Sequence, residues 1–338
     1  MKCADYIQPS KIAFRNDATD PVAAEGEVLV RVSACGICGS DLHMFRNDSY
    51  RDHLVRHTPD GYSVPGHEFA GTIAALGEGV SGWSVGERVV GVTGMGGGMA
   101  ELVAVPVNPF QLVRIPDGVS DAEAATTEPM ADGLQMVRKA ELSAGEAVVV
   151  FGVGIIGLGV IQAIRARGID VAAIIAVDVH KARLDKALEI GATHAVSAMD
   201  GDVFDQVSAI TGIEDGYRGR SARIDAVFDC AGYIAHMKGP PPLETALKLV
   251  SSRGGRIICF GGFEGAMTID LGPIIQKEPV IMGSNGYAAE ELVEALDLMQ
   301  RGAIDRRCLI TESCMIEQIS EAFSIQMQAD QVKVMVKI

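Results

Sequence analysis

The sequence lacks most of the features that mark nucleic-acid-binding, secreted and disulfide-rich proteins. Basic residues are scarce: 29 Lys and Arg stand against 44 Asp and Glu, which gives a formal net charge of −15. A chain this acidic is not expected to bind nucleic acid or an anionic membrane surface. Residues 1–6 lack the apolar core of a signal peptide. The seven cysteines are an odd number without the spacing of a small disulfide scaffold, which favours a reducing compartment and hence the cytoplasm.

The composition is that of an ordinary globular protein, and 338 residues are enough for two domains. Residues 1 to about 110 show no helical periodicity and read as short strands separated by Gly and Pro. Alternating apolar residues predict strands at 27–34, 71–76 and 87–92. The N-terminal part is therefore expected to be a compact, β-rich body.

The pattern changes near residue 121, where helical segments begin and then alternate with apolar runs. The runs predict six strands, at 147–151, 172–178, 193–197, 225–229, 255–260 and 280–283. This order is typical of an α/β fold with a doubly wound parallel sheet. Two amphipathic helices (290–301 and 316–327) and a closing strand (332–336) follow. The β character of the tail suggests that it returns to the N-terminal body, so we expect one domain at 1–129 and 287–338 and the other at 130–286.

A glycine turn follows the first of these strands. The apolar run 147–151 leads into Gly152, Gly154, Ile155, Ile156 and Gly157, and a helix-length apolar segment comes next. The first glycine permits a tight turn, the second lets the backbone approach a pyrophosphate at the helix N-terminus, and the third allows close packing. The alternative, a membrane-spanning helix, is disfavoured by the glycines and by the second apolar run.

An acidic residue ends the second strand of this pattern. Asp178 lies 21 residues after Gly157, where a carboxylate can receive the ribose hydroxyls of a dinucleotide. The same carboxylate would repel the 2′-phosphate of NADP. The sequence therefore predicts a Rossmann domain that binds NAD.

Candidate metal ligands lie in three short stretches outside that domain. Residues 35–43 contain Cys38, residues 65–71 contain His67 and Glu68, and Glu128 precedes a proline. Thiolate, imidazole and carboxylate together are typical of a zinc site with an open position. The alternative is that Cys38 is a small buried side chain and His67 a core histidine. A zinc knuckle or redox pair formed with Cys35 is disfavoured, because no second Cys-x-x-Cys and no following helix are expected.

The stretches G-I-C-G-S-D-L-H, G-H-E-F-A-G-T-I, G-E-R-V-V-G, E-P-M-A, F-D-C-A-G and K-E-P-V-I-M-G-S-N-G-Y occur in this order along nearly the whole chain. They resemble those of the zinc-dependent medium-chain alcohol and polyol dehydrogenases, and the Glu-Pro dipeptide is similar to the sorbitol, butanediol and threonine dehydrogenase branch. The resemblance implies a GroES-like catalytic domain beside the Rossmann domain. It also implies Cys38 and His67 as zinc ligands, with Glu68 and Glu128 competing for the third place.

Other roles also come from the resemblance. Asp41 matches a carboxylate that orients the metal ligands, and Ser40 and His43 match a proton relay, although both could be polar surface groups of a turn. Arg183 matches a basic residue beside the adenosine ribose. Glu128 is implied as a group on the zinc or on its water.

Two departures from the family pattern stand out. Residues 91–100 contain no cysteine, so the second, structural zinc of many relatives is expected to be absent. The segment 44–64 is longer than usual and mixes Arg and His with Asp. Such a segment is expected to be a solvated loop, or alternatively a cover whose cations meet an anionic substrate.

The resemblance implies a zinc- and NAD-dependent enzyme that oxidises a secondary alcohol or polyol to a ketone, acting as a homodimer or homotetramer. The alternatives are an L-threonine-type amino-alcohol dehydrogenase and a zinc-free quinone or enone reductase of the same superfamily. A catalytically silent NAD-binding sensor is a third alternative, of a different class. The sequence does not name the substrate.

Overall fold

A computed structural model describes residues 1–217, 219–234, 237 and 239–338. The chain forms two compact units, of which the first comprises Met1–Glu128 and Ala288–Ile338 and the second Pro129–Tyr287. The sequence placed the domain changes after residues 129 and 286. Within the described residues, no helix is long and apolar enough to cross a bilayer.

The first unit is built on a sheet with the strand order β18-β19-β3-β6-β7-β9, in which β8 also pairs with β3. The strands are β3 (Glu27–Gly36), β6 (Glu68–Leu76), β7 (Arg88–Val92), β8 (Leu102–Pro106), β9 (Leu112–Arg114), β18 (Ile310–Met315) and β19 (Lys333–Lys337). In β3, Val28, Val30 and Val32 alternate with more exposed residues and enter the core. The alternation of apolar residues therefore places one face of this strand in the core.

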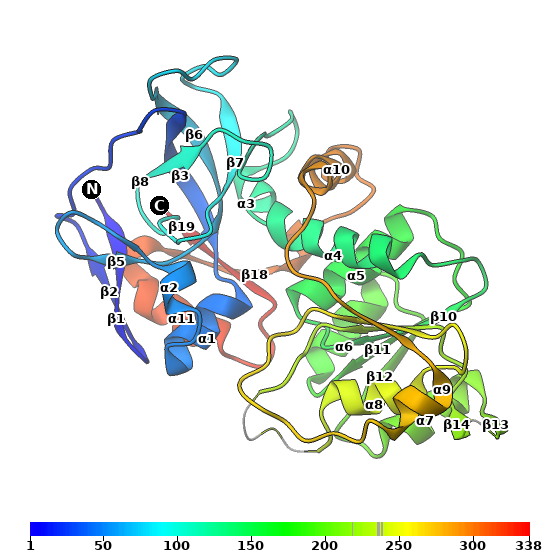
Figure 1. Ribbon diagram of the computed structural model, residues 1–338. Coiled ribbons are helices and arrows are strands. Elements are labelled where there is room, and N and C mark those ends of the chain that lie inside the picture. The colour runs from blue at the N-terminus through cyan, green and yellow to red at the C-terminus, as the bar shows by residue number, and fades with distance from the viewer. Residues whose placement is uncertain (218, 235–236, 238) are drawn as a thin grey trace. The chain divides into compact units, whose positions relative to one another are not determined.

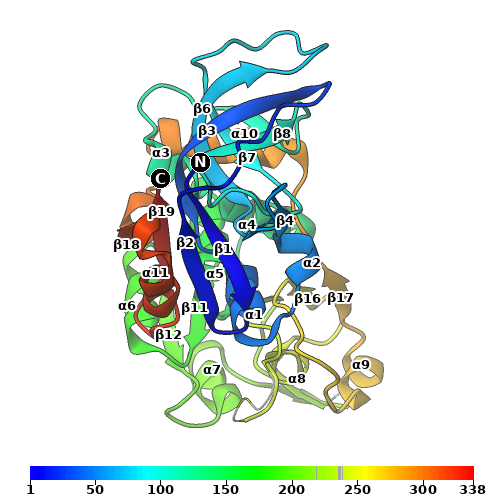
Figure 2. The same ribbon diagram turned by 90° about the vertical axis from the view of Figure 1, so that its left-hand side faces the viewer.

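The tail of the chain joins this sheet. Strand β19 pairs antiparallel with β3 and parallel with β18. Helix α11 (Ile319–Gln326) packs against β2 (Lys11–Arg15), which forms a hairpin with β1 (Cys3–Gln8), as Figures 1 and 2 show. The last helix begins three residues later than the predicted start at residue 316, because the 3-10 turn η2 (Ile316–Gln318) precedes it.

The expectation that residues 1 to about 110 contain no helix is wrong. Helices α1 (Gly39–Asn47) and α2 (Arg51–Leu54) follow β3. A short hairpin of β4 (Arg56–His57) and β5 (Ser63–Val64) comes next. The segment 44–64 thus contains helices and a hairpin rather than one continuous loop, and many of its residues are exposed to solvent, as expected. Helix α1 escaped prediction because it starts with Gly and Ser, which are poor helix formers.

The second unit contains the predicted doubly wound sheet. Its strands are all parallel and run in the order β12-β11-β10-β15-β16-β17. They are β10 (Ala147–Phe151), β11 (Ala173–Asp178), β12 (His194–Ser197), β15 (Ala226–Asp229), β16 (Arg256–Cys259) and β17 (Val280–Gly283). Each matches a predicted apolar run to within two residues, because strands buried on both faces are continuously apolar.

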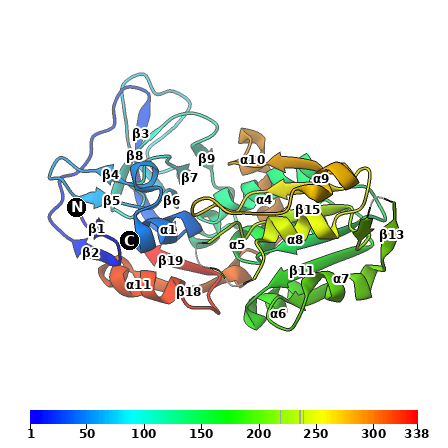
Figure 3. The same cartoon turned by 60° about the horizontal axis from the view of Figure 1, so that its bottom comes forward.

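Helices cover both faces of this sheet. The helices are α4 (Thr127–Ala140), α5 (Ile155–Ala166), α6 (Lys181–Glu189), α7 (Val203–Thr211), α8 (Pro242–Leu249) and α9 (Gly272–Lys277). Helices α6 and α8 lie on opposite sides of the sheet (Figure 3), and α7 and α8 contribute to one hydrophobic cluster with the strands. Within the described residues of this unit, β13 (Glu214–Gly216) and β14 (Gly219–Ser221) form a separate two-stranded hairpin outside the six-stranded sheet.

Candidate metal and cofactor sites

The first candidate ligand, Cys38, caps the N-terminus of α1. The Asp41 carboxylate, fully buried, accepts a hydrogen bond from the Cys38 backbone N–H at 2.9 Å. The expectation that no helix follows the Cys35–Cys38 pair is therefore wrong. A helix N-terminus favours a thiolate, but burial and then the charge of Glu68 raise the pKa of the Cys38 thiol to about 12. The seven cysteines all lie among the described residues, and none forms a disulfide.

The stretch around His67 depends on a glycine. Gly66 has φ +88°, and a Cβ there would lie 2.7 Å from Met99 Cγ and 2.8 Å from Cys35 Sγ. The His67 carbonyl accepts a hydrogen bond from Thr93 N at 2.9 Å. Glu68 follows as the first residue of β6. Gly66 thus allows the chain to pass close to the end of β3 before it enters the sheet.

Glu68 is held by a lysine that the sequence analysis did not identify. The Lys333 ammonium donates to Glu68 Oε1 and, at 3.0 Å, to the Ile37 carbonyl. The two side chains are 0% and 1% exposed. Burial alone would lower the pKa of Lys333, but the charges of Glu68 and Cys38 raise it. A Cβ at Gly36 would lie 2.5 Å from Lys333 Cε, so this glycine makes room for the ion pair.

Glu128 joins the cluster from another element, as the second residue of α4. Burial tends to lower the pKa of His67, but the negative charges of Glu128 and Asp41 raise it overall. After burial, the negative charges of Glu68 and Glu128 also raise the pKa of the Cys38 thiol. The structure therefore brings Cys38, His67, Glu68 and Glu128 into one electrostatic cluster.

The cluster has the donor chemistry of a zinc site. As the side chains stand in the described part of the chain, no three His, Cys, Asp or Glu groups are arranged to hold a metal ion. However, His67 Nδ1, Asp41 Oδ1 and Glu68 Oε2 are buried there without hydrogen-bond partners among the described residues. Orphaned buried polar atoms are rare, and each costs about 1–3 kcal/mol. A cation held by sulfur, nitrogen and oxygen donors would compensate, so the residues fit zinc.

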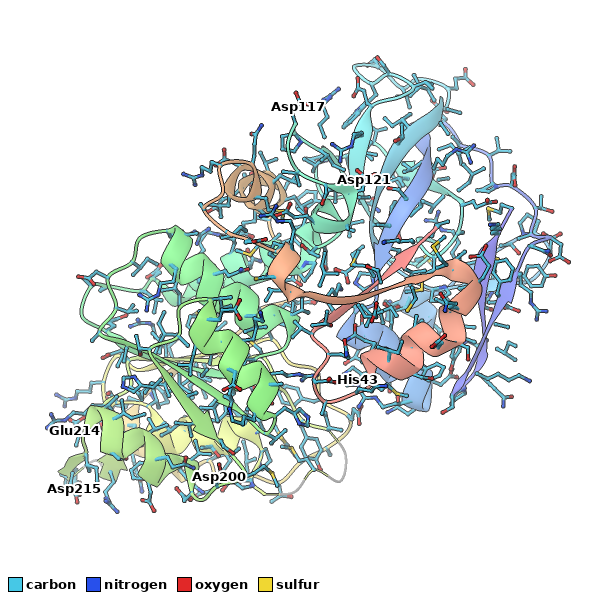
Figure 4. The ribbon with its side chains drawn as sticks, turned by 180° about the vertical axis from the view of Figure 1, so that it is seen from behind. His43, Asp117, Asp121, Asp200, Glu214 and Asp215 are labelled. Atoms are coloured by element: carbon cyan, nitrogen blue, oxygen red, sulfur yellow. The ribbon has the colours of Figure 1, made fainter. Side chains whose placement is uncertain are left out.

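The two residues of the expected proton relay lie on α1 rather than in a turn. Ser40 is the second residue of this helix and His43 the fifth, and His43 is labelled in Figure 4. Both are half-buried. The Tyr50 ring meets the His43 ring edge-on, with 5.8 Å between the centroids. The helix therefore presents Cys38, Ser40 and His43 from one short stretch.

The cations of residues 44–64 are engaged within their own unit. Arg56 donates to the Ala104 carbonyl at 2.6 Å, and Arg46 to the Leu42 carbonyl at 3.2 Å. Arg51 lies 3.6 Å from Asp48. These contacts give no support to a cover whose cations meet an anionic substrate.

In the second unit the glycine turn has the expected geometry. Gly152 has φ +76°, and a Cβ there would lie 2.8 Å from Ala231. A Cβ at Gly157 would collide with the Gly152 carbonyl oxygen. Gly154 caps α5 and has open space beside it. Gly154, Ile155 and Ile156 lie at the N-terminus of α5, a position whose backbone N–H groups favour an anion such as a pyrophosphate.

Asp178 ends β11 beside this turn. Its carboxylate accepts hydrogen bonds from Val153 N and His180 N, each at 2.9 Å. A carboxylate has about four lone-pair sites, so Asp178 keeps the capacity to accept ribose hydroxyls while it fixes the turn. Arg183 follows on α6, half-buried.

Comparisons with known proteins identify the family. A family model described as the alcohol dehydrogenase GroES-like domain matches residues 24–117, and one described as zinc-binding dehydrogenase matches residues 156–301. (R,R)-butanediol dehydrogenase of Bacillus subtilis (strain 168) is 30% identical, covering 100% of this chain and 99% of that protein. Sorbitol dehydrogenase of the same organism is 30% identical over 92% and 90%. L-threonine 3-dehydrogenase of Serratia proteamaculans (strain 568) is 26% identical over 96% and 95%.

Two solved dehydrogenase structures are similar to this chain over its whole length. The crystal structure of 2R,3R-butanediol dehydrogenase from Bacillus subtilis has a TM-score of 0.81 and 28% identity. An alcohol dehydrogenase from Escherichia coli CFT073 complexed with NADH has a TM-score of 0.82 and 26% identity. Each comparison covers 100% of this chain and 99% of the other.

A Cys–His–carboxylate cluster and a Rossmann unit together define a metal-dependent dehydrogenase that uses a nicotinamide dinucleotide. The chain belongs to the zinc-binding dehydrogenase family with an alcohol dehydrogenase GroES-like domain. It is an enzyme, an oxidoreductase, as the sequence predicted.

Proposed function

We propose that this enzyme oxidises a secondary alcohol or polyol to a ketone with NAD as the hydride acceptor. The observation that carries the proposal is the half-buried cluster of Cys38, His67 and Glu128, next to the helix that bears Ser40 and His43. The butanediol and sorbitol dehydrogenases among its relatives support this substrate class.

The roles of the side chains follow from their placement. When bound, zinc supplies a Lewis acid for the alcohol oxygen, and NAD supplies the hydride acceptor. Cys38, His67 and Glu128 would hold the metal, and Glu68 stays on the side of Lys333. Ser40 and His43, three residues apart on one helix, lie on the same face and can pass the substrate proton toward solvent.

A substrate screen tests this proposal. Polyols, amino alcohols and hydroxy acids are supplied with NAD, and nicotinamide absorbance is followed. The highest kcat/KM is expected for a vicinal diol or polyol. The L-threonine 3-dehydrogenase relatives favour an amino alcohol as the second candidate. Reduction of quinones or enones that survives both removal of zinc and Cys38→Ser would instead assign the chain to the zinc-free reductases.

Asp178 sets the choice of dinucleotide in this proposal. A carboxylate facing the 2′-phosphate of NADP should cost roughly 1–3 kcal/mol through repulsion and lost hydrogen bonds. The unmodified enzyme is therefore expected to prefer NAD by at least about tenfold in kcat/KM. Asp178→Ala should narrow this gap, although it also removes an acceptor for Val153 N. Equal efficiency with both dinucleotides before mutation contradicts the assignment.

Strand β17 supports a homodimer. It is the last strand in the sheet order, and Val280 and Ile281 on it are 49% and 40% exposed. An apolar edge strand is a template for pairing with another chain, and a second copy offers an identical edge. Ile281→Lys is expected to shift the enzyme from dimer or tetramer to a smaller species in size-exclusion chromatography with light scattering. Val293→Lys, at an exposed site on α10 (Ala289–Gln300), should leave the size unchanged.

The cytoplasm remains the proposed location. Burial raises the pKa of Cys35 and Cys230 well above the usual value. Such thiols suit a protein that keeps its cysteines reduced.

A further inference from the structure

Arg306 is a buried cation for which the proposed reaction has no use. It lies in the first unit between α10 and the 3-10 turn η1 (Arg307–Leu309), and it is 0% exposed. The next residue, Arg307, has a 68% exposed side chain and pairs with Asp305 at 3.0 Å. Burial of a guanidinium is expensive unless its contacts compensate. Arg306 is therefore buried while its neighbour Arg307 is exposed, and the contacts of Arg306 must account for the difference.

The Arg306 side chain forms a clip to one turn through two consecutive hydrogen bonds. Its Nε donates to Thr126 Oγ1 at 3.3 Å, and the Thr126 hydroxyl donates to the Glu123 carbonyl at 2.7 Å. Arg306 thus binds the turn through its side chain. The turn follows α3 (Asp121–Ala124).

The clipped turn leads directly to a proposed ligand. Thr127 Oγ1 donates to the Ala124 carbonyl at 2.6 Å, and Glu128 is the next residue. Burial lowers the pKa of Arg306 to about 10, and the negative charge of Glu68, the other candidate carboxylate, acts in the opposite direction. The hydrogen bond from Arg306 to Thr126 therefore fixes the backbone that leads to Glu128.

We infer that Arg306 is a positioning residue for Glu128: the clip through Thr126 and Glu123 fixes the turn from which the Glu128 carboxylate reaches the metal. This inference rests on the proposed function, because it takes Glu128 as a zinc ligand. It predicts that Thr126, which touches no substrate or cofactor in this account, affects zinc binding through Glu128.

A double-mutant cycle tests the inference on the full-length holoenzyme. Thr126→Val removes the hydroxyl with little change of shape, and Thr126→Ser keeps it. Zinc affinity is measured by competition with a chromogenic chelator. Thr126→Val is expected to weaken zinc binding by about 10-fold, as is usual for groups that support a ligand. Thr126→Ser and the surface control Arg307→Met should stay within about twofold of the unmodified enzyme, well below the losses that such supporting groups cause.

The cycle is completed with Glu128→Gln. In that background, Thr126→Val should cause no further loss of zinc affinity, because coupled residues are non-additive. A full additional loss, or no loss in the unmodified background, would overturn the inference and leave the clip a purely structural contact. If Glu128→Gln alone leaves zinc affinity unchanged, the ligand assignment in the proposed function fails instead, and the inference falls with it.

A spectroscopic measurement separates positioning from general stability. In cobalt-substituted protein, Arg306→Lys should retain the visible ligand-field bands and Thr126→Val should shift them, while the KM for NAD is unchanged in both. Arg306→Met is expected to behave like Thr126→Val. If it does not fold, Thr126→Val still decides, and unshifted bands in that variant contradict the inference.

Discussion

Lys333→Met is expected to lower the free energy of unfolding of the first unit by about 3–5 kcal/mol, because it leaves a buried carboxylate without its cation. Lys333 and Glu68 are among the least exposed charged side chains of the described residues. The ammonium bridges Glu68 and the Ile37 carbonyl, so both acceptors lose a donor at once. Urea denaturation followed by tryptophan fluorescence measures the effect, since the single tryptophan, Trp83, lies in this unit.

Two further variants test whether the loss comes from the unpaired charge. Lys337→Met removes a lysine from the exposed end of the same strand and should change stability by less than about 0.5 kcal/mol. Adding Glu68→Gln to Lys333→Met should restore part of the stability, because a neutral amide is cheaper to bury than a carboxylate. A loss below about 1 kcal/mol in Lys333→Met, the ordinary size for a point mutation, would show that Glu68 is not buried as a charged group.

Glu128→Ala is expected to lower zinc affinity or kcat more than Glu68→Ala does. The expected loss for Glu128→Ala is at least about 100-fold, beyond the range for groups that only support a ligand. Glu68→Ala should lose less, because its Oε1 is already bound by Lys333. Zinc retention after dialysis against a chelator, and turnover with saturating NAD, measure both variants. Zinc loss in Glu68→Ala but not in Glu128→Ala would reverse the two roles.

Each strand of the second unit could be predicted, because several independent physical requirements act on the same residues. A parallel strand covered on both faces must be continuously apolar, and Gly152 and Gly157 allow no Cβ. Such requirements fix the residue types, so apolar runs and glycines can be recognised directly in the sequence. In the first unit, the alternation of apolar residues in β3 made this strand equally recognisable.

The N-terminal part of the site was harder to predict. Helix α1 is only 9 residues long and begins with Gly and Ser, and its start is stabilised by the local bond between Cys38 N and Asp41 rather than by periodicity. Lys333 was missed because a single basic residue beside apolar neighbours reads as surface, and Arg306 was missed because it stands between two other charged residues, Asp305 and Arg307. Their partners lie far away in sequence, and only the fold brings Lys333 to Glu68. A lysine within the otherwise apolar run 332–336 was the one available signal.

Zinc content per chain tests the account most directly. Elemental analysis of metal-replete, active enzyme is expected to give one zinc per chain, since residues 91–100 offer no cysteine for a second site. The same preparation should lose NAD-dependent alcohol oxidation when the zinc is removed and regain it when zinc is returned. One zinc with reversible activity is the predicted result; two zincs per chain, or full activity with none, would contradict it.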